Sequence, residues 1–245
     1  MASVAWRLIV NDVLHGASGI YALRTDVLTM SALVRQACGK VHAAVRLRDE
    51  RMAEEVVRGD DAIDEMELDL DATCTSLIAR TQPVARDLRF ILTAVRMVLD
   101  LERIADEAVT IARQIHLLPQ RLPGTLEQEL DASMRLALEM LDIACSAFRA
   151  EDVSAGMAVF RRTDASVRLM MSLYGTLMEA VGRNALAGPA AVPLILMVRS
   201  IDRICRRSEN IVEHLCFLCE GVTVKHRARL SGGARRQAED MRGTR

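Results

Sequence analysis

Apolar residues recur along this chain at the three- and four-residue spacing of amphipathic helices, and the pattern breaks at only a few places. Proline and glycine mark several of the breaks: Pro83 precedes a helical segment, Pro123 follows it, and Gly188 and Pro189 separate the last two segments. Segments of about 30 residues are longer than most globular helices and favour an elongated bundle. The pattern predicts six long helices, over residues 15–46, 48–80, 84–117, 125–149, 151–184 and 190–220.

The composition supports an all-α fold. Hydrophobic residues make up 51% of the 245 residues, but aromatic residues make up only 3%, and the chain has 13 glycines and 5 prolines. A β-sandwich or β-barrel needs more turn-forming and aromatic residues, so the composition argues against these folds. The length allows one large domain or two small ones.

An internal repeat divides the helices into two groups of three. Leu101–Ile104 in the third helix matches Ile201–Ile204 in the sixth, 100 residues later, and Asp60–Asp64 corresponds to Asp164–Arg168, 104 residues later. We therefore expect two tandem three-helix bundles. The expected organisation is an N-terminal extension over residues 1–14, a first repeat over 15–122, a second repeat over 123–224 and a tail over 225–245.

The net charge of −1 hides an uneven distribution. The last 21 residues contain seven Lys or Arg residues and two acidic residues, which predicts a basic, disordered tail. Contact of this tail with an acidic partner or anionic lipid is the alternative to a solvated end. The tail contains no aromatic residues, so binding to nucleic acid is not expected. The sequence shows no pattern of a membrane span or of a secretory signal, and we expect a cytoplasmic protein.

The six cysteines lie within apolar helical patterns and are expected to be reduced core residues. Cys216 and Cys219 form a single CxxC pair, and His214 is the one further candidate ligand close to it in sequence. A structural zinc site needs a second ligand pair. Packing in the core is therefore the preferred interpretation, and a metal or redox role is the alternative.

Two helices carry carboxylates on a face that is otherwise apolar. In the second helix, Asp64 and Glu67 lie within about 40° of Asp60 around the helix axis, and apolar residues precede and follow them on that face. In the third helix, Glu102 and Asp106 continue the apolar stripe that begins in its first turn. Acids at this spacing repel one another, and turning them toward a neighbouring helix adds a desolvation cost.

The opposite face of the third helix is expected to be solvated. Its arginines would point away from the carboxylates and could not neutralise them. The carboxylates therefore either line a solvated groove at the surface of the bundle or bind a hard metal ion, as carboxylates from facing helices do in other bundles. The residues of the expected solvated face are Arg89, Arg96, Asp100, Arg103 and Glu107.

Several motifs together resemble the PhoU family of phosphate-signalling proteins. They include Gln82–Arg89 (QPVARDLR), Leu101–Asp106 (LERIAD) and Thr110–Ala112, where Thr stands in place of the family's usual Asn. Asp60–Glu67 resembles the acidic motif of the family's second helix, and Val222–Arg227 resembles its closing stretch. The resemblance covers residues 15–227.

The resemblance implies two three-helix bundles related by a pseudo-twofold axis. It also implies a cytoplasmic, homodimeric regulator without catalytic activity, which restrains phosphate uptake and the phosphate regulon by linking the ATPase subunit of the Pst phosphate transporter to a sensor histidine kinase. Each bundle of the family can carry a metal ion or multinuclear cluster on E/DxxxD motifs, with iron as the expected metal and manganese, zinc or magnesium as alternatives. The resemblance places such a site on Asp60, Asp64, Glu102 and Asp106.

The second repeat departs from the family's metal motif. Asp164 is followed by Arg168, and Asp202 by Arg206, where the motif has a second acid. The two arginines can pair with the two aspartates through charge-assisted hydrogen bonds, and this set of ion pairs would take the place of the metal. We therefore expect metal in the first repeat only and a neutral, metal-free second repeat.

A carboxylate-bridged di-metal protein, acting as an oxidase or as a metal or phosphate buffer, is the alternative function. Di-metal bundle proteins use a Glu-x-x-His ligand pair. The core helices contain no such pair, and the nearest match, Asp12 with His15, lies at the start of the first helix. Glycine-rich phosphate loops and serine nucleophile turns are also absent from the sequence. The adaptor is therefore the preferred interpretation.

Overall fold

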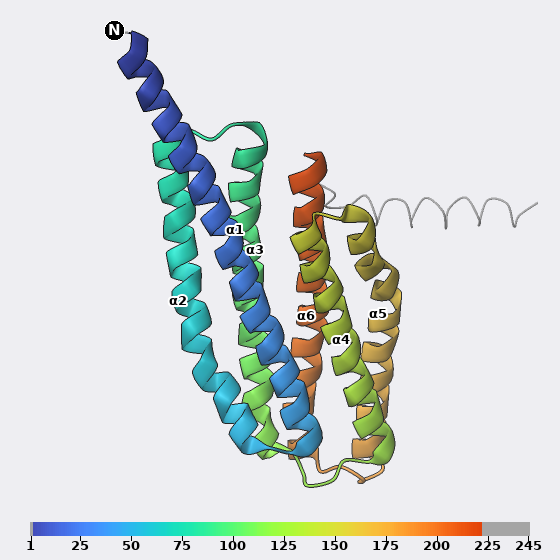
Figure 1. Ribbon diagram of the computed structural model, residues 1–245. Helices are drawn as coiled ribbons and strands as arrows, with labels where there is room; N and C mark the ends of the chain where they lie inside the picture. Colours follow the sequence, from blue (N-terminus) through green and yellow to red (C-terminus); the bar gives the residue numbers. More distant parts are fainter. Residues whose placement is uncertain (1, 222–245) are drawn as a thin grey trace, which may run out of the picture.

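In a computed structural model of the protein, residues 2–221 form six long α-helices and a short 3₁₀ helix (Figure 1). The structure describes the backbone of these residues and the side chains of residues 18–221. The elements are α1 (Ala2–Leu47), α2 (Glu50–Thr81), α3 (Ala85–Gln114), η1 (Ile115–Leu117), α4 (Gly124–Ala150), α5 (Val153–Gly182) and α6 (Gly188–Glu220). No strand occurs within residues 2–221, and the predicted all-α fold of two three-helix bundles is confirmed. In this described part of the chain, none of the helices has the length and apolar character needed to cross a membrane.

The first helix begins well before residue 15, where the apolar pattern predicts its start. Residues 2–14 contain neither proline nor glycine, so nothing in this stretch ends a helix, and α1 extends to Ala2. The other helix boundaries agree with the prediction to within a few residues. The third helix, predicted to end at 117, is α3 continued by η1 as far as Leu117. The predicted basic tail over 225–245 and the motif Val222–Arg227 lie outside the described residues.

The same kind of turn joins the first and second helices of each repeat. Arg48 (φ 55°) and Glu151 (φ 52°) both adopt the left-handed conformation, and an aspartate follows each of them. The Asp49 carboxylate accepts hydrogen bonds at 2.9 and 3.1 Å from backbone N–H groups in the first turn of α2. Asp152 accepts one at 2.9 Å in the first turn of α5. The left-handed residue and the helix cap together set the sharp reversal between antiparallel helices.

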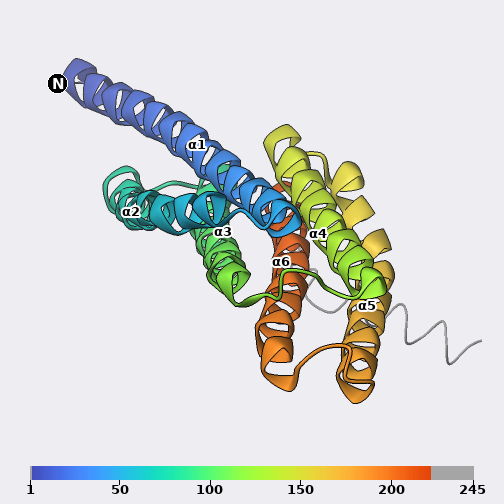
Figure 2. The ribbon, with the colours of Figure 1, turned by 90° about the horizontal axis from the view of Figure 1, so that it is seen from below.

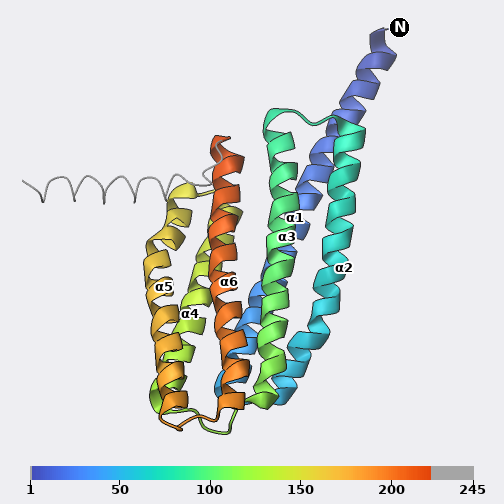
Figure 3. The same ribbon diagram turned by 180° about the vertical axis from the view of Figure 1, so that it is seen from behind.

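The two repeats pack side by side. α1 and α4 lie in one layer, α3 and α6 lie in the other, and α2 and α5 lie at the two outer flanks (Figure 1, Figure 2). Seen from behind, α5, α6, α3 and α2 form a row (Figure 3). α3 contacts α6 and α1 contacts α4, so these two helix pairs make the interface between the repeats.

α3 and α6 are the central helices of the molecule. α3 has fifteen buried residues and α6 sixteen, whereas α2 has five and α5 seven. A central helix packs against its own bundle on one side and against the other repeat on the opposite side, so both of its faces are covered. Polar residues on the second covered face of α3 must therefore find partners on α6.

The cysteines are free thiols, and five of the six are buried as core residues. The expectation of a core position is wrong for Cys219, which is exposed. Its Sγ donates to the backbone carbonyl of Glu151 at 3.6 Å, where the end of α6 passes the turn between α4 and α5. The second cysteine of the CxxC pair therefore lies at the surface rather than in the core.

Candidate metal centre

The four carboxylates of the predicted metal site lie on two neighbouring helices of the first repeat. Asp60 and Asp64 are on α2, and Glu102 and Asp106 are on α3, which packs beside it (Figure 3). Asp60 and Glu102 are partly buried, whereas Asp64 and Asp106 are exposed. The group therefore lies in the seam between the two helices and is open to solvent.

Two of the four carboxyl groups, Asp60 and Glu102, have raised pKa values. Burial raises the pKa of Asp60 to about 6, and the negative charges of Asp64 and Asp106 add to this effect. Burial also raises the pKa of Glu102 to about 7, with further contributions from the charges of Asp106 and Glu67 and from a hydrogen bond with Asp106. Nearby arginines oppose both shifts without reversing them. The seam therefore holds negative charge that the protein does not neutralise.

This donor set fits a hard cation in chemistry and in charge. All of the donors are carboxylate oxygens, which suit iron, manganese or magnesium. As the side chains are placed, however, no group of three or more His, Cys, Asp or Glu residues in the described part of the chain is arranged to hold a metal ion. A cation bound here would therefore have to draw the carboxylates of α2 and α3 into a tighter arrangement.

The metal-free protein is expected to lose stability as the pH rises from about 4 to about 7. Asp60 and Glu102 have raised pKa values in the folded state, so in this range these two groups hold more protons in the folded protein than in the unfolded chain. That stabilisation is lost as the two carboxyl groups ionise. Glu102→Gln cannot ionise and should flatten the slope. Thermal unfolding in a chelator across this pH range measures the effect, and an equal slope in the variant would argue against the grouping of these acids.

The corresponding positions of the second repeat hold two aspartates and two arginines. Arg206 Nε donates to Asp202 Oδ2 at 2.8 Å, so this carboxylate is paired within α6. Asp164 and Arg168 are both exposed on α5, and the described side chains include no ion pair between them. Of the two ion pairs considered, the described side chains therefore form the one between Asp202 and Arg206.

The opposite face of α3 is only partly solvated, contrary to the prediction from the helical wheel. Arg96 and Arg103 are exposed, but Asp100 and Glu107 are 4% and 9% exposed. Arg203 Nη1 on α6 donates to Glu107 Oε1 at 2.8 Å. The prediction is wrong for these two acids because a wheel with one apolar stripe assumes one covered face, whereas α3 has two.

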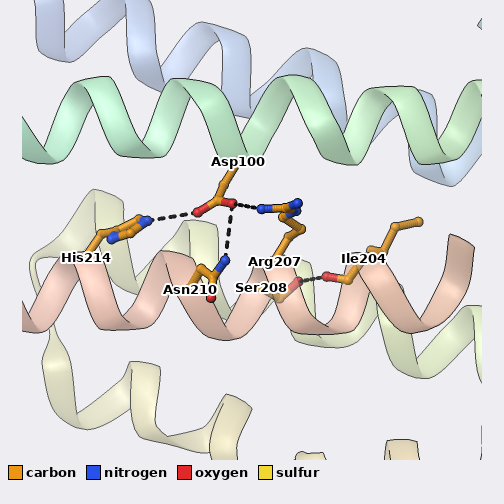
Figure 4. A network of polar contacts seen from close by, with 6 residues as sticks. All are labelled: Asp100, Ile204, Arg207, Ser208, Asn210 and His214. Carbon is orange, nitrogen blue, oxygen red and sulfur yellow. Dashed lines mark hydrogen bonds and ion pairs between the residues drawn. The ribbon is translucent and has the colours of Figure 1, made fainter. Parts of the chain in front are cut away.

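Asp100 is the centre of a buried polar network that joins the repeats (Figure 4). Its Oδ1 accepts hydrogen bonds from Arg207 Nη1 at 2.7 Å and from Asn210 Nδ2 at 3.3 Å, and its Oδ2 lies 2.8 Å from His214 Nε2. Burial acts to raise the pKa of Asp100, but the hydrogen bonds from His214 and Arg207 outweigh it and hold the pKa below its usual value. An ionised carboxylate therefore lies inside the molecule, satisfied entirely by the other repeat.

The sequence pattern does not reveal this network because Asp100 lies more than 100 residues from each of its partners. Asn210 of the second repeat has its acidic partner, Asp100, in the first repeat. The internal repeat holds a usable signal, since the position equivalent to Asp100 is the buried Ser200, and a carboxylate at a buried position needs a cation opposite. The contact of His214 with Asp100 also removes the one histidine that a metal site at Cys216 and Cys219 could have used.

Comparison with known proteins agrees with the fold and the motifs. Residues 27–115 and 132–215 match the PhoU domain. The chain is 32% identical to the phosphate-specific transport system accessory protein PhoU homologue of Aquifex aeolicus, over 83% of this chain and 92% of that protein. It is 27% identical to the phosphate-specific transport system accessory protein PhoU of Escherichia coli K12, over 84% of this chain and 85% of that protein.

Solved structures share the fold. The crystal structure of PhoU from Pseudomonas aeruginosa superimposes with a TM-score of 0.79 and 28% identity, covering 84% of this chain and 99% of that one. The phosphate transport system regulatory protein PhoU from Streptococcus pneumoniae superimposes with a TM-score of 0.78 and 23% identity, covering 85% and 99%. The two domain matches together span well over half of the chain, so this chain belongs to the PhoU family.

Proposed function

We propose that this protein is a non-enzymatic regulator of phosphate homeostasis. It acts in the cytoplasm as a homodimer and restrains phosphate uptake and the phosphate regulon by linking the ATPase subunit of the Pst phosphate transporter to a sensor histidine kinase. The observation that carries the proposal is the PhoU domain match over both 27–115 and 132–215. Relatives that match over more than four-fifths of this chain are named accessory proteins of the phosphate-specific transport system.

The proposal includes a metal ion or multinuclear cluster held by Asp60, Asp64, Glu102 and Asp106, with iron as the first candidate and manganese, zinc or magnesium as alternatives. The raised pKa values of Asp60 and Glu102 support a cation in this seam, because a cation would relieve the repulsion among the carboxylates. When bound, the cation would neutralise the seam and tie α2 to α3. In the second repeat, the pairing of Asp202 with an arginine supports restriction of the metal to the first repeat.

An exposed apolar stripe on α5 supports a role in binding other proteins. Val167, Met171 and Met178 are 47%, 69% and 66% exposed and lie on one side of the helix, at spacings of four and seven residues. Tyr174 lies between them and is half-buried. Contiguous exposed apolar surface marks an interaction site on a stable protein. A di-metal oxidase or a metal or phosphate buffer needs no such surface, so the stripe favours the adaptor over these alternatives.

Deletion of the gene is expected to switch on phosphate-starvation genes in phosphate-replete cells, and the wild-type gene should restore repression. Met171→Glu combined with Met178→Glu should fail to restore it, because two carboxylates on the stripe would oppose apolar contact with a partner. A phosphate-starvation reporter measures repression. Retention of the purified Pst ATPase on the immobilised protein measures binding, which should fall at least about tenfold in the double variant.

The matched control is Leu68→Glu, which changes an apolar residue that is 68% exposed on α2 of the first repeat. It should repress the reporter and retain the ATPase like the wild type. Unchanged expression of starvation genes in the deletion strain would refute the regulatory role. Full repression by the Met171→Glu, Met178→Glu variant would instead refute the placement of the partner on α5.

A further inference from the structure

Ion pairs line the interface between the repeats where α1 packs beside α4 (Figure 2). Arg24 Nη2 lies 2.5 Å from Glu151 Oε1 near one end, and Arg48 Nη2 lies 4.0 Å from Glu127 Oε1 near the other. Among the described side chains, the first repeat supplies the basic partner of every pair on this side, and the second repeat supplies the acid. The further pairs join Arg35 to Asp142, Arg86 to Glu151, and both His42 and Arg46 to Asp131.

The direction of charge is reversed where α3 packs against α6. Here the first repeat supplies the acids Asp100 and Glu107. The second repeat supplies the basic partners, which are Arg203, Arg207 and His214. A first repeat therefore brings a basic α1 and two acids of α3 to the interface, and a second repeat brings an acidic α4 and a basic α6.

The charges at the two ends of the α1 and α4 contact are opposite at equivalent positions of the repeats. The turns that follow these helices align at an offset of 103 residues, as their capping aspartates show. At this offset Arg24 is equivalent to Glu127, and Arg48 is equivalent to Glu151. Arg48 and Glu151 both adopt the left-handed conformation, so the backbone is alike and the charge differs. The two end contacts therefore occupy equivalent places, and the first repeat supplies the basic residue at both.

Like repeats from two copies of the chain would bring like charges together. In the same packing geometry, Arg24 of one first repeat would lie opposite Arg48 of the other, and two second repeats would set Glu127 against Glu151. Like charges placed opposite one another suppress a wrong pairing. Pairing of a first repeat with a second repeat is the arrangement that sets each of these charges against an opposite one.

We propose that these charges determine which repeats pair, so that a first repeat packs against a second repeat and not against its own kind. The two repeats have the same fold, and shape alone therefore separates the two kinds of pairing poorly. An isologous contact between two first repeats would use one surface twice, and the charge pattern makes that surface repel itself. The proposal involves neither the metal seam nor the stripe on α5, so its failure would leave the proposed regulatory function untouched.

Two double variants of the full-length protein with the same net charge test the proposal. Arg48→Glu with Glu151→Arg exchanges the residues of the two equivalent turns and places like charges at both end contacts. It should lower the Tm by at least about 3 °C, because two attractions become repulsions. After unfolding in denaturant and refolding, it should also form assemblies larger than those of the wild type, because like repeats of two copies now carry opposite charges. Size-exclusion chromatography with light scattering measures their size.

The matched control is Arg48→Glu with Glu127→Arg, which exchanges charges within one pair and keeps opposite charges at both ends. It should have the Tm and the size of the wild type. The difference in Tm between the two double variants should fall by at least half in 1 M NaCl, where the screening length is only about 3 Å. If the turn exchange does not fold, Glu127→Arg alone breaks one pair, and adding Arg48→Glu should restore the lost Tm.

The proposal is overturned if the two double variants have the same Tm, if they refold into species of the same size, or if salt leaves their difference in Tm unchanged. Failure of Arg48→Glu to restore the Tm of Glu127→Arg would overturn it equally.

Discussion

Asp100→Ala is expected to lower the free energy of unfolding by about 3–5 kcal/mol, the usual cost of removing one partner from a buried ion pair. The substitution leaves the Arg207 guanidinium and the His214 ring without their acceptor and removes the hydrogen bond from Asn210. These groups lie between α3 and α6, where water replaces the lost carboxylate poorly. Chemical denaturation followed by circular dichroism measures the loss as a lower midpoint at an unchanged slope.

The matched control for this prediction is Asp106→Ala, six residues further along the same helix. Asp106 is exposed and repels its carboxylate neighbours, so its removal should leave the metal-free protein as stable as the wild type or slightly more stable. Asp100→Leu combined with Arg207→Met and His214→Leu removes both sides of the network and should recover most of the lost stability. A loss below about 1 kcal/mol for Asp100→Ala would mean that the network contributes no more than a surface ion pair.

Metal content is expected to fall at least about tenfold when Asp60 and Asp106 are both replaced by alanine. The double substitution removes one donor from α2 and one from α3, and Asp64 and Glu102 alone offer too few oxygens for a hard cation. Inductively coupled plasma mass spectrometry of the purified protein gives the metal content per chain and the identity of the metal.

Asp164→Ala combined with Asp202→Ala makes the equivalent change in the second repeat and should keep the metal content of the wild type. Metal retained by the first-repeat variant, or lost from the second-repeat variant, would contradict a site restricted to the first repeat. A chelator gives an independent readout, since a ligand that binds only the folded state stabilises it. Chelation should lower the Tm of the wild type and leave the Tm of the Asp60→Ala, Asp106→Ala variant unchanged.

The boundaries of α2 to α6 could be predicted because nearby residues mark them. Pro83 and Pro123 flank α3 and its 3₁₀ extension, and the breaks in the apolar pattern fall where Asp49 and Asp152 cap the next helices. The start of α1 has no such mark, and the apolar pattern alone placed it too late. A helix continues beyond its amphipathic portion when no residue interrupts it.

Some contacts of the candidate site could be predicted from the spacing of residues on one helix, whereas others depend on which helices pack together. The ion pair of Asp202 with Arg206 follows from their spacing of four residues on one helix. The approach of Asp60 to Asp106 depends on which helices pack side by side, and the PhoU motifs supplied that information before the structure did. The contact of Asp100 with the second repeat has neither a local pattern nor a motif; the difference from Ser200 in the internal repeat marks the position, but only the three-dimensional arrangement shows its partners.

The two covered faces of α3 and α6 have a consequence for how the chain folds. A chain divided after Leu117 would expose Asp100 and Glu107 in one half and their arginine partners, Arg203 and Arg207, in the other, together with the apolar surface around them. Neither half would retain a complete interior. The sequence is therefore duplicated, but each repeat completes the interior of the other, and we expect the two repeats to unfold together.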